Sequence, residues 1–249
     1  MDKQTLHQRI KEYAEKVANR SEQSLDDLNA RQERIAYYQS WTADRIRNMS
    51  DEDLFEFISK LWAMRIWGNK QYVVDKLIED HGLEKVRNEL AELIWSKAPI
   101  EQRWDRFRSE IKGMGPAMIS EILSHVYPEE YMLWNRRAYV GLEALGVDNL
   151  PRYNYQLTGE KYKKLCDIVA ELAQEMRAAG MKDANMLTVD YFIWDELQAD
   201  VNLSQIFKKD STKEADDSIA KADDKTSEFI HDEIKENIAN IGRFGCSSS

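Results

Sequence analysis

The chain has 249 residues, enough for one large domain or two small ones. Hydrophobic residues make up 43% of the sequence and include seven Trp, eleven Tyr and seven Phe, which excludes a disordered chain and predicts a buried core. The formal net charge of −10 argues against the generally basic surface that many nucleic-acid-binding proteins present, although a local basic face would suffice for binding.

Cysteines and apolar runs restrict the class further. Cys166 and Cys246 lie far apart, so we expect neither a disulfide framework nor a cysteine-bound metal or iron–sulfur centre. No run of about 20 apolar residues predicts a membrane span, and the charged N-terminal segment has no apolar signal core. The four histidines are scattered, and no phosphate-binding or dinucleotide-binding glycine loop appears. We therefore expect a cytoplasmic protein without a membrane partner, a metal or a cofactor.

Helical spacing of apolar residues dominates the chain and predicts an all-α protein. The periodic stretches are rich in Ala, Leu, Glu, Lys and Arg, and only ten Gly and four Pro interrupt the chain. No convincing alternating strand pattern is present. In chain order, helices are predicted over residues 6–17, 25–46, from 51 onward after Ser50, 72–79, 83–95, 100–111, 116–126, 134–145 and 160–179, followed by a last one that Thr188 caps.

The character of the sequence changes after Phe207. Residues 208–226 contain almost no apolar side chain and predict an acidic, solvated linker between a helical domain at 1–207 and a C-terminal helix and tail at 227–249. The C-terminal helix either folds back onto the main domain or begins a further domain. It resembles the lead-in helix of some restriction-type nuclease domains.

Basic residues gather in the middle of this acidic chain. The run consists of Lys97, Arg103, Arg106, Arg108 and Lys112, with Arg136 and Arg137 further along. Such a run is typical of a patch that faces phosphates. The alternative is an ordinary solvated helix face, because Glu101, Asp105 and Glu110 are interleaved with the basic residues.

Residues 111–123 read I-K-G-M-G-P-A-M-I-S-E-I-L and predict two helices joined as a tight αα-hairpin. The glycines permit a sharp turn and a close approach to a ligand, and the free N–H groups of the second helix form an anion site. In a DNA-binding protein that anion is a backbone phosphate. The alternative is an ordinary helix–helix turn with a glycine cap. The predicted DNA-binding residues are Lys112, Gly113, Met114, Gly115, Pro116, Ala117, Arg136 and Arg137.

This segment resembles the helix-hairpin-helix family, and more narrowly the DNA glycosylase superfamily built on that hairpin. The hairpin pattern in that superfamily is roughly L-P-G-[IV]-G-x-K-T-A, and here the whole motif is predicted over 100–126. Asn135 follows eighteen residues after Ala117, and the next helix ends at Leu145-Gly146, as the superfamily pattern requires. The resemblance implies a multi-helix glycosylase-like domain that binds duplex DNA through its backbone phosphates.

The chain departs from the superfamily where the chemistry lies. Ala117 stands at the position of the lysine that attacks the sugar in bifunctional members, and Asn135 stands at the position of the aspartate that supports catalysis. An amide carries no charge and cannot act as a general base, so no catalytic residue is assigned. Substitute carboxylates exist, but spacing selects none of them, and each is predicted to be a surface charge: Glu121, Glu129, Glu130, Asp190 and Asp195.

A module of this kind can also receive an extruded base, in a pocket with aromatic walls and amide-type hydrogen bonding to the base edge. The base-pocket candidates are Trp134, Asn135, Tyr131 and Tyr139. The alternatives are that Trp134 and the two tyrosines belong to the core, and that Asn135 caps the helix that follows it.

Three functional hypotheses follow. The first is a DNA-binding module without glycosylase activity that reads a modified or flipped base in DNA repair, or in restriction and defence, where such modules occur fused to or beside a nuclease domain or subunit. The second is an active glycosylase or lyase with a displaced carboxylate. The third is a helical scaffold that docks a protein partner, which the acidic charge would suit.

Overall fold

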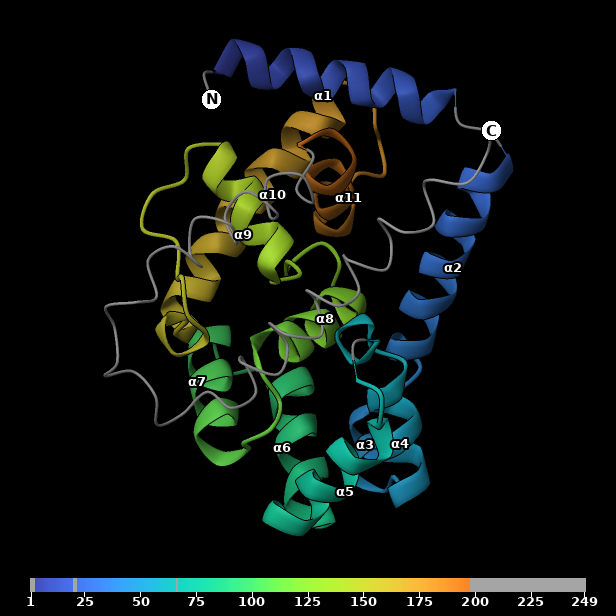
Figure 1. Ribbon diagram of the computed structural model, residues 1–249, viewed down its shortest axis with the longest axis vertical. Coiled ribbons are helices and arrows are strands. Elements are labelled where there is room, and N and C mark those ends of the chain that lie inside the picture. Colours follow the sequence, from blue (N-terminus) through green and yellow to red (C-terminus); the bar gives the residue numbers. More distant parts are fainter. Residues whose placement is uncertain (1–2, 20–21, 66, 198–249) are drawn as a thin grey trace, which may run out of the picture.

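The computed structural model describes residues 3–19, 22–65 and 67–197 of the chain. Within these ranges every regular element is a helix and no strand is present, which confirms the predicted all-α class (Figure 1). No helix in the same ranges has both the length and the apolar character that a membrane crossing requires. The predicted linker at 208–226 and the predicted C-terminal helix at 227–249 lie outside the described residues.

The first half of the chain forms α-helices and one short 3-10 helix. They are α1 (Lys3–Ala18), α2 (Glu22–Gln39), α3 (Ala43–Arg47), α4 (Asp51–Ser59), η1 (Trp62–Met64), α5 (Lys70–His81) and α6 (Leu83–Trp95). The single helix predicted at 25–46 is wrong, because Thr42 starts a new helix by accepting the Arg45 backbone N–H at 3.2 Å. The helix start predicted after Ser50 is confirmed, with Ser50 and Asp53 capping each other's backbone N–H groups.

The second half contains α7 (Ile100–Glu110), α8 (Pro116–Val126), α9 (Arg136–Ala144), η2 (Asn154–Gln156), α10 (Gly159–Ala178) and α11 (Met186–Glu196). The predicted cap of the last helix is wrong. Asn185 caps α11 by accepting the N–H groups of Leu187 and Thr188, and Thr188 is the third residue of the helix. Asn and Thr are both common N-cap residues, and here the Thr188 hydroxyl accepts the Asn185 N–H in return, which forms a capping box.

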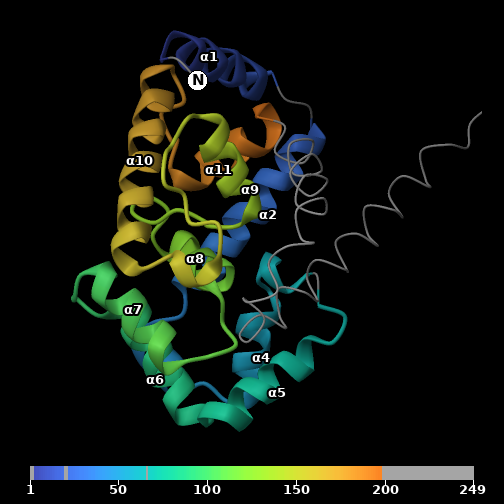
Figure 2. The same cartoon turned by 60° about the vertical axis from the view of Figure 1, so that its left-hand side comes forward.

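Helix α8 lies at the centre of the molecule. Every one of its residues except Ala117 is buried. It packs on α2, η1 and α11. In Figures 1 and 2, the group α3 to α7 lies on one side of α8, and the group α1, α9, α10 and α11 lies on the other. Helix α8 therefore lies between the two groups, which also meet directly where α7 packs on α10.

Helix α7 packs on other helices than α8 does. It packs on α6 and α10. The Trp104 ring stacks on the Tyr162 ring of α10 at a centroid distance of 4.0 Å, and the Trp104 indole N–H donates to the Leu157 carbonyl at 3.1 Å. The helices α7 and α8, joined by residues 111–115, therefore pack mainly on different partners (Figure 2).

Candidate nucleic-acid interface

The connection between α7 and α8 turns at Gly113. This residue has φ +92°, in the left-handed region that favours glycine, so the sharp turn predicted here is confirmed. Gly115 has the ordinary extended values φ −78° and ψ 171° and is the N-cap residue of α8. A Cβ added to Gly115 would meet no atom within 4 Å. Neither backbone conformation nor packing inside the protein therefore requires glycine at position 115.

The first turn of α8 carries no side-chain cap. Pro116 occupies the first helical position, as predicted, and the Ile119 N–H bonds back to the Gly115 carbonyl at 3.1 Å. Within the described part of the chain, the N–H groups of Ala117 and Met118 have no side-chain acceptor. The first turn of α8 also contains no acidic residue, so none of its own side chains offsets the positive end of the helix dipole beside Gly115.

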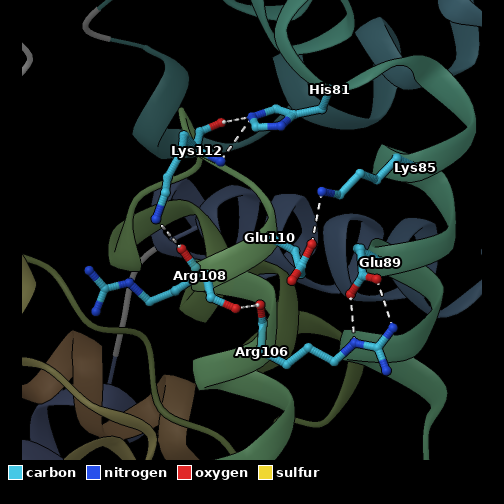
Figure 3. A network of polar contacts seen from close by, with 8 residues as sticks. His81, Lys85, Glu89, Arg106, Arg108, Glu110 and Lys112 are labelled. Carbon is cyan, nitrogen blue, oxygen red and sulfur yellow. Dashed lines mark hydrogen bonds and ion pairs between the residues drawn. The ribbon is translucent and has the colours of Figure 1, made fainter.

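His81, the last residue of α5, fixes the start of this connection. Its Nε2 lies 3.0 Å from the backbone nitrogen of Lys112 and 3.1 Å from the Lys112 carbonyl oxygen (Figure 3). The Lys112 side chain is exposed, and its ammonium group donates to the Arg108 carbonyl at 3.0 Å. Because that acceptor is neutral, the positive charge of Lys112 is not cancelled by the contact.

Most of the predicted basic run does not form a free patch. Arg103 is buried and donates to the Leu93 carbonyl at 2.6 Å and to the Tyr131 hydroxyl at 2.7 Å. Arg106 makes a two-point ion pair with Glu89, at 2.8 and 3.0 Å (Figure 3). The prediction of a phosphate-facing patch is therefore wrong for these two arginines, because the carboxylate and carbonyl groups of α6 take up their charge and donors.

Arg108 is also committed within the protein. Its guanidinium donates to the Leu157 carbonyl at 2.6 Å, and partial burial lowers its pKa. On the α6 side of the connection, Lys85 pairs with Glu110 at 2.8 Å (Figure 3). Of the basic residues predicted at 97–112, Lys97 and Lys112 remain exposed, one at each end of α7.

Arg136 and Arg137 occupy the first turn of α9 and are half-buried. The Arg136 guanidinium lies 4.8 Å from the Tyr139 ring centroid, and that of Arg137 lies 4.0 Å from the Trp194 ring centroid. Each arginine therefore covers an aromatic face with its cation. Both remain close to the surface, so their predicted DNA contact stays a prediction.

The base-pocket candidates have mainly structural roles. Trp134 and Tyr131 are 5% and 8% exposed, so neither forms a wall that a base could reach, and this part of the prediction is wrong. Asn135 is the N-cap of α9, with its side-chain oxygen accepting the Ala138 N–H at 2.9 Å. Tyr139 is half-buried and donates its hydroxyl to Glu143 at 3.2 Å. The core and cap alternatives account for these positions.

Comparisons with protein-family models, with curated proteins and with solved structures find no match for this chain. The site is therefore interpreted from its own geometry. Across the described residues, no group of three or more His, Cys, Asp and Glu side chains is placed to hold a metal ion.

Of the substitute carboxylates, the expectation of a surface charge is wrong for Glu121, which is buried, and is met only in part by Asp190 and Asp195, which are both half-buried. Glu121 is only 2% exposed. Burial raises the pKa of Asp190, while the charges of Arg137 and Arg31 oppose the rise. Glu129 and Glu130 are exposed, as expected.

Glu121 is the most enclosed of these carboxylates. Its two oxygens accept the backbone N–H groups of Trp62 at 2.5 Å and Ala63 at 3.0 Å. Burial raises its pKa to about 7, and the two N–H donors and the Arg34 charge limit the rise. The Nδ1 atom of neighbouring His125 lies 2.6 Å from the Glu121 carbonyl oxygen. Burial lowers the pKa of His125 to about 4. Helical spacing could not predict that Glu121 binds these two N–H groups, because Trp62 and Ala63 lie on η1, far from Glu121 in sequence.

Proposed function

We propose that this protein is a DNA-binding module of the helix-hairpin-helix, glycosylase-like type, and that it holds duplex DNA by its backbone phosphates without excising bases. The observation that carries the proposal is the open first turn of α8. Gly113 turns the chain, Gly115 leaves open space, and the N–H groups of Ala117 and Met118 lack a side-chain cap. These features favour close approach of an anion.

The charge at this turn supports a phosphate as the anion. The ammonium group of Lys112 is exposed next to the turn, and it contacts a carbonyl oxygen rather than a carboxylate. Since Arg103 and Arg106 are committed elsewhere, the proposed contact is narrower than the predicted patch. A contact to phosphates alone positions the protein on DNA and is independent of base sequence.

The same geometry supports the absence of base excision. Ala117 has no nucleophile, and the amide oxygen of Asn135 already caps α9. Glu121 is buried, with both oxygens bound to backbone N–H groups. None of these side chains offers a free carboxylate to a sugar in DNA.

The test measures the affinity for a labelled duplex by fluorescence anisotropy between about 50 and 200 mM salt, since phosphate contacts weaken as counterions are added. Lys112→Glu should weaken binding about tenfold and reduce the salt dependence. Gly115→Ala should also weaken binding, because its methyl group would occupy the space that a phosphate needs, although it has room in the free protein. Both effects should be the same for duplexes of unrelated sequence.

Lys97→Glu is the matched control, because it makes the same charge change at the opposite end of α7. It should leave the affinity within about twofold. If the parent protein shows no salt-dependent duplex binding, or if Lys97→Glu and Lys112→Glu weaken it equally, the hairpin is not the DNA contact. The scaffold hypothesis then takes its place.

A further inference from the structure

The C-terminal end of α5 lies against the turn proposed to bind phosphate. His81, its last residue, has its Nε2 atom 3.0 Å from the Lys112 backbone nitrogen and 3.1 Å from the Lys112 carbonyl oxygen (Figure 3). Leu77, one helical turn earlier on the same face of α5, lies next to Gly113, because a Cβ added to that glycine would be 3.7 Å from Leu77 Cδ1. Helix α5 therefore supports the connection to α8 at two successive residues.

A single ring nitrogen of His81 thus faces both a donor and an acceptor. The neutral imidazole can leave Nε2 without a proton, and Nε2 then accepts the Lys112 N–H. In the charged imidazole both ring nitrogens carry protons, so Nε2 can only donate, and the Lys112 carbonyl oxygen is placed to accept from it. The protonation state of His81 therefore decides which backbone group of Lys112 it binds, and either contact keeps the ring against the connection.

Protonation of His81 changes two properties of the turn, and both favour an anion. The Lys112 N–H loses the acceptor that it has in the described structure and becomes available to a ligand. The ring also gains a positive charge. Lys112 and Gly115 are three residues apart and span at most about 11 Å. At about 0.1 M salt the screening length is about 10 Å, so a charge on His81 still acts on a phosphate beside Gly115.

The charged side chains on the neighbouring helices do not cancel this effect by contact with the ring. On α5 and α6 they form ion pairs of their own: Lys76 with Glu79 and Asp80, and Lys85 with Glu110 of α7 (Figure 3). Glu84, at the start of α6, is exposed, so solvent screens its charge. The connection itself contributes Lys112, whose ammonium group donates to a neutral carbonyl. A protonated His81 is therefore a second cation next to the turn.

We infer that His81 is a positioning residue of the phosphate contact, and that it makes duplex binding tighter at mildly acidic than at mildly alkaline pH. This inference rests on the proposed function and adds the regulation of the same site. His81 acts through the backbone of Lys112 and through its own charge. Histidine is the side chain whose charge ordinarily changes between about pH 5 and 8, so the effect falls in the physiological range.

The test measures the affinity of the full chain for one labelled duplex between about pH 5.5 and 8, at constant salt. The parent should gain about threefold in affinity from the alkaline to the acidic end. His81→Gln should gain much less and should match the parent at the alkaline end. Its amide can still bond to the Lys112 backbone, but it cannot become charged.

His7→Gln is the matched control, because it removes a histidine that is 60% exposed on α1, far from α5 in Figure 1. It should keep the pH dependence of the parent. A second measurement is calorimetry of duplex binding in two buffers with different ionisation enthalpies, which counts the protons taken up with DNA. Near neutral pH the parent and His7→Gln should take up a fraction of a proton that His81→Gln does not. A merely structural role of His81 would not produce this difference.

The outcomes separate this inference from the proposed function. If the parent binds no duplex at any pH, the proposed function fails and the inference fails with it. If the parent binds duplex and His81→Gln shows the same pH dependence and proton uptake, the phosphate contact stands and only the inference is refuted. Equal weakening of His81→Gln at every pH would also refute it, because His81 would then only support the turn. Circular dichroism checks folding, and His81→Asn replaces His81→Gln in both measurements if that variant is unfolded.

Discussion

The Glu121 carboxylate accepts the Trp62 backbone N–H at 2.5 Å and so joins the middle of the central helix to the 3-10 helix η1. The Glu121 side chain is buried, and the two residues are 59 positions apart in sequence. A carboxylate held in this way is sensitive to proton concentration, because burial favours its neutral form and the N–H donors favour its charged form.

Stability should therefore depend on pH through Glu121. The folded-state pKa is raised from 4.5 to about 7, so the folded protein binds more protons than the unfolded chain between these values. This contribution is present at acidic pH and is lost as pH rises from about 4.5 through 7, a change of about 3 kcal/mol. Glu121→Gln removes it. The difference in unfolding free energy between parent and variant, from urea titrations, should be largest near pH 4.5 and smallest above pH 7.

His125 acts in the opposite direction. Its folded-state pKa is lowered from 6.5 to about 4, so acidification below about pH 6.5 destabilises the fold. As pH falls from 6.5 to 4.5, the stability gained through Glu121 offsets the stability lost through His125 in the parent. Glu121→Gln lacks the first contribution, so its unfolding free energy should decrease steadily as pH falls over that range. An equal pH dependence in the parent and Glu121→Gln would show that Glu121 keeps an ordinary pKa.

Gly159→Ala should strongly destabilise the protein. A Cβ at this position would lie 2.1 Å from the Glu101 carbonyl oxygen, where α10 meets α7, and a backbone atom cannot move aside as a flexible side chain can. We expect a loss of about 3 kcal/mol or more in unfolding free energy, measured by denaturant titration. Gly115→Ala is the control, because its Cβ meets open space, and it should lose about 1 kcal/mol or less. Comparable losses in the two variants would contradict the close approach of α7 and α10.

Arg103→Met should lower stability without a specific effect on DNA binding. The substitution removes the donors to the Leu93 carbonyl and the Tyr131 hydroxyl, both of them buried, and we expect a loss of about 2–4 kcal/mol. Lys164→Met, which breaks an exposed pair with Glu160, should leave stability almost unchanged, because solvent screens such a pair. Thermal unfolding distinguishes the two. A fully stable Arg103→Met that loses DNA affinity would return Arg103 to the interface.

Asn135→Asp should keep the cap of α9 and still show no base excision. Asp caps helices as well as Asn does, and its charge suits the positive helix end, so stability should be unchanged or slightly higher. Asn135→Ala should lose about 1 kcal/mol. The assay incubates each protein with duplexes that carry uracil, 8-oxoguanine or alkylated purines and scores abasic sites. Excision by the parent that survives Asn135→Ala but stops with Glu121→Gln or Asp190→Asn would establish an active enzyme with a displaced carboxylate.

Local signals in the sequence predicted the helices well. The Ser50 cap, the turn at Gly113 and Pro116 at the start of α8 are set by neighbouring residues, and all three are confirmed. The break at Thr42 was missed because apolar spacing continues across it to buried Ile46. The spacing of apolar residues indicates which residues face the core, but it does not show where one helix ends and another begins in a new direction.

The candidate site was less predictable, because the sequence does not show which group each charged side chain contacts in the folded protein. Arg103 and Lys112 look alike in the basic run, yet one is buried on carbonyl groups of α6 and the other is exposed at the turn. Glu121 was likewise predicted to be a surface carboxylate, because its partners on η1 cannot be read from the sequence around it. Such assignments depend on residues from other helices, which only the folded structure brings together.

The burial of every residue of α8 except Ala117 also affects how tightly the proposed phosphate contact can bind. A loop that becomes ordered on binding must give up conformational entropy, which weakens its affinity. The first turn of α8 belongs to a helix that the core already immobilises, so its N–H groups are aligned before DNA arrives. A single turn with one exposed lysine can then contribute more to affinity than its small area suggests. Binding should proceed with little change in amide hydrogen exchange along α8.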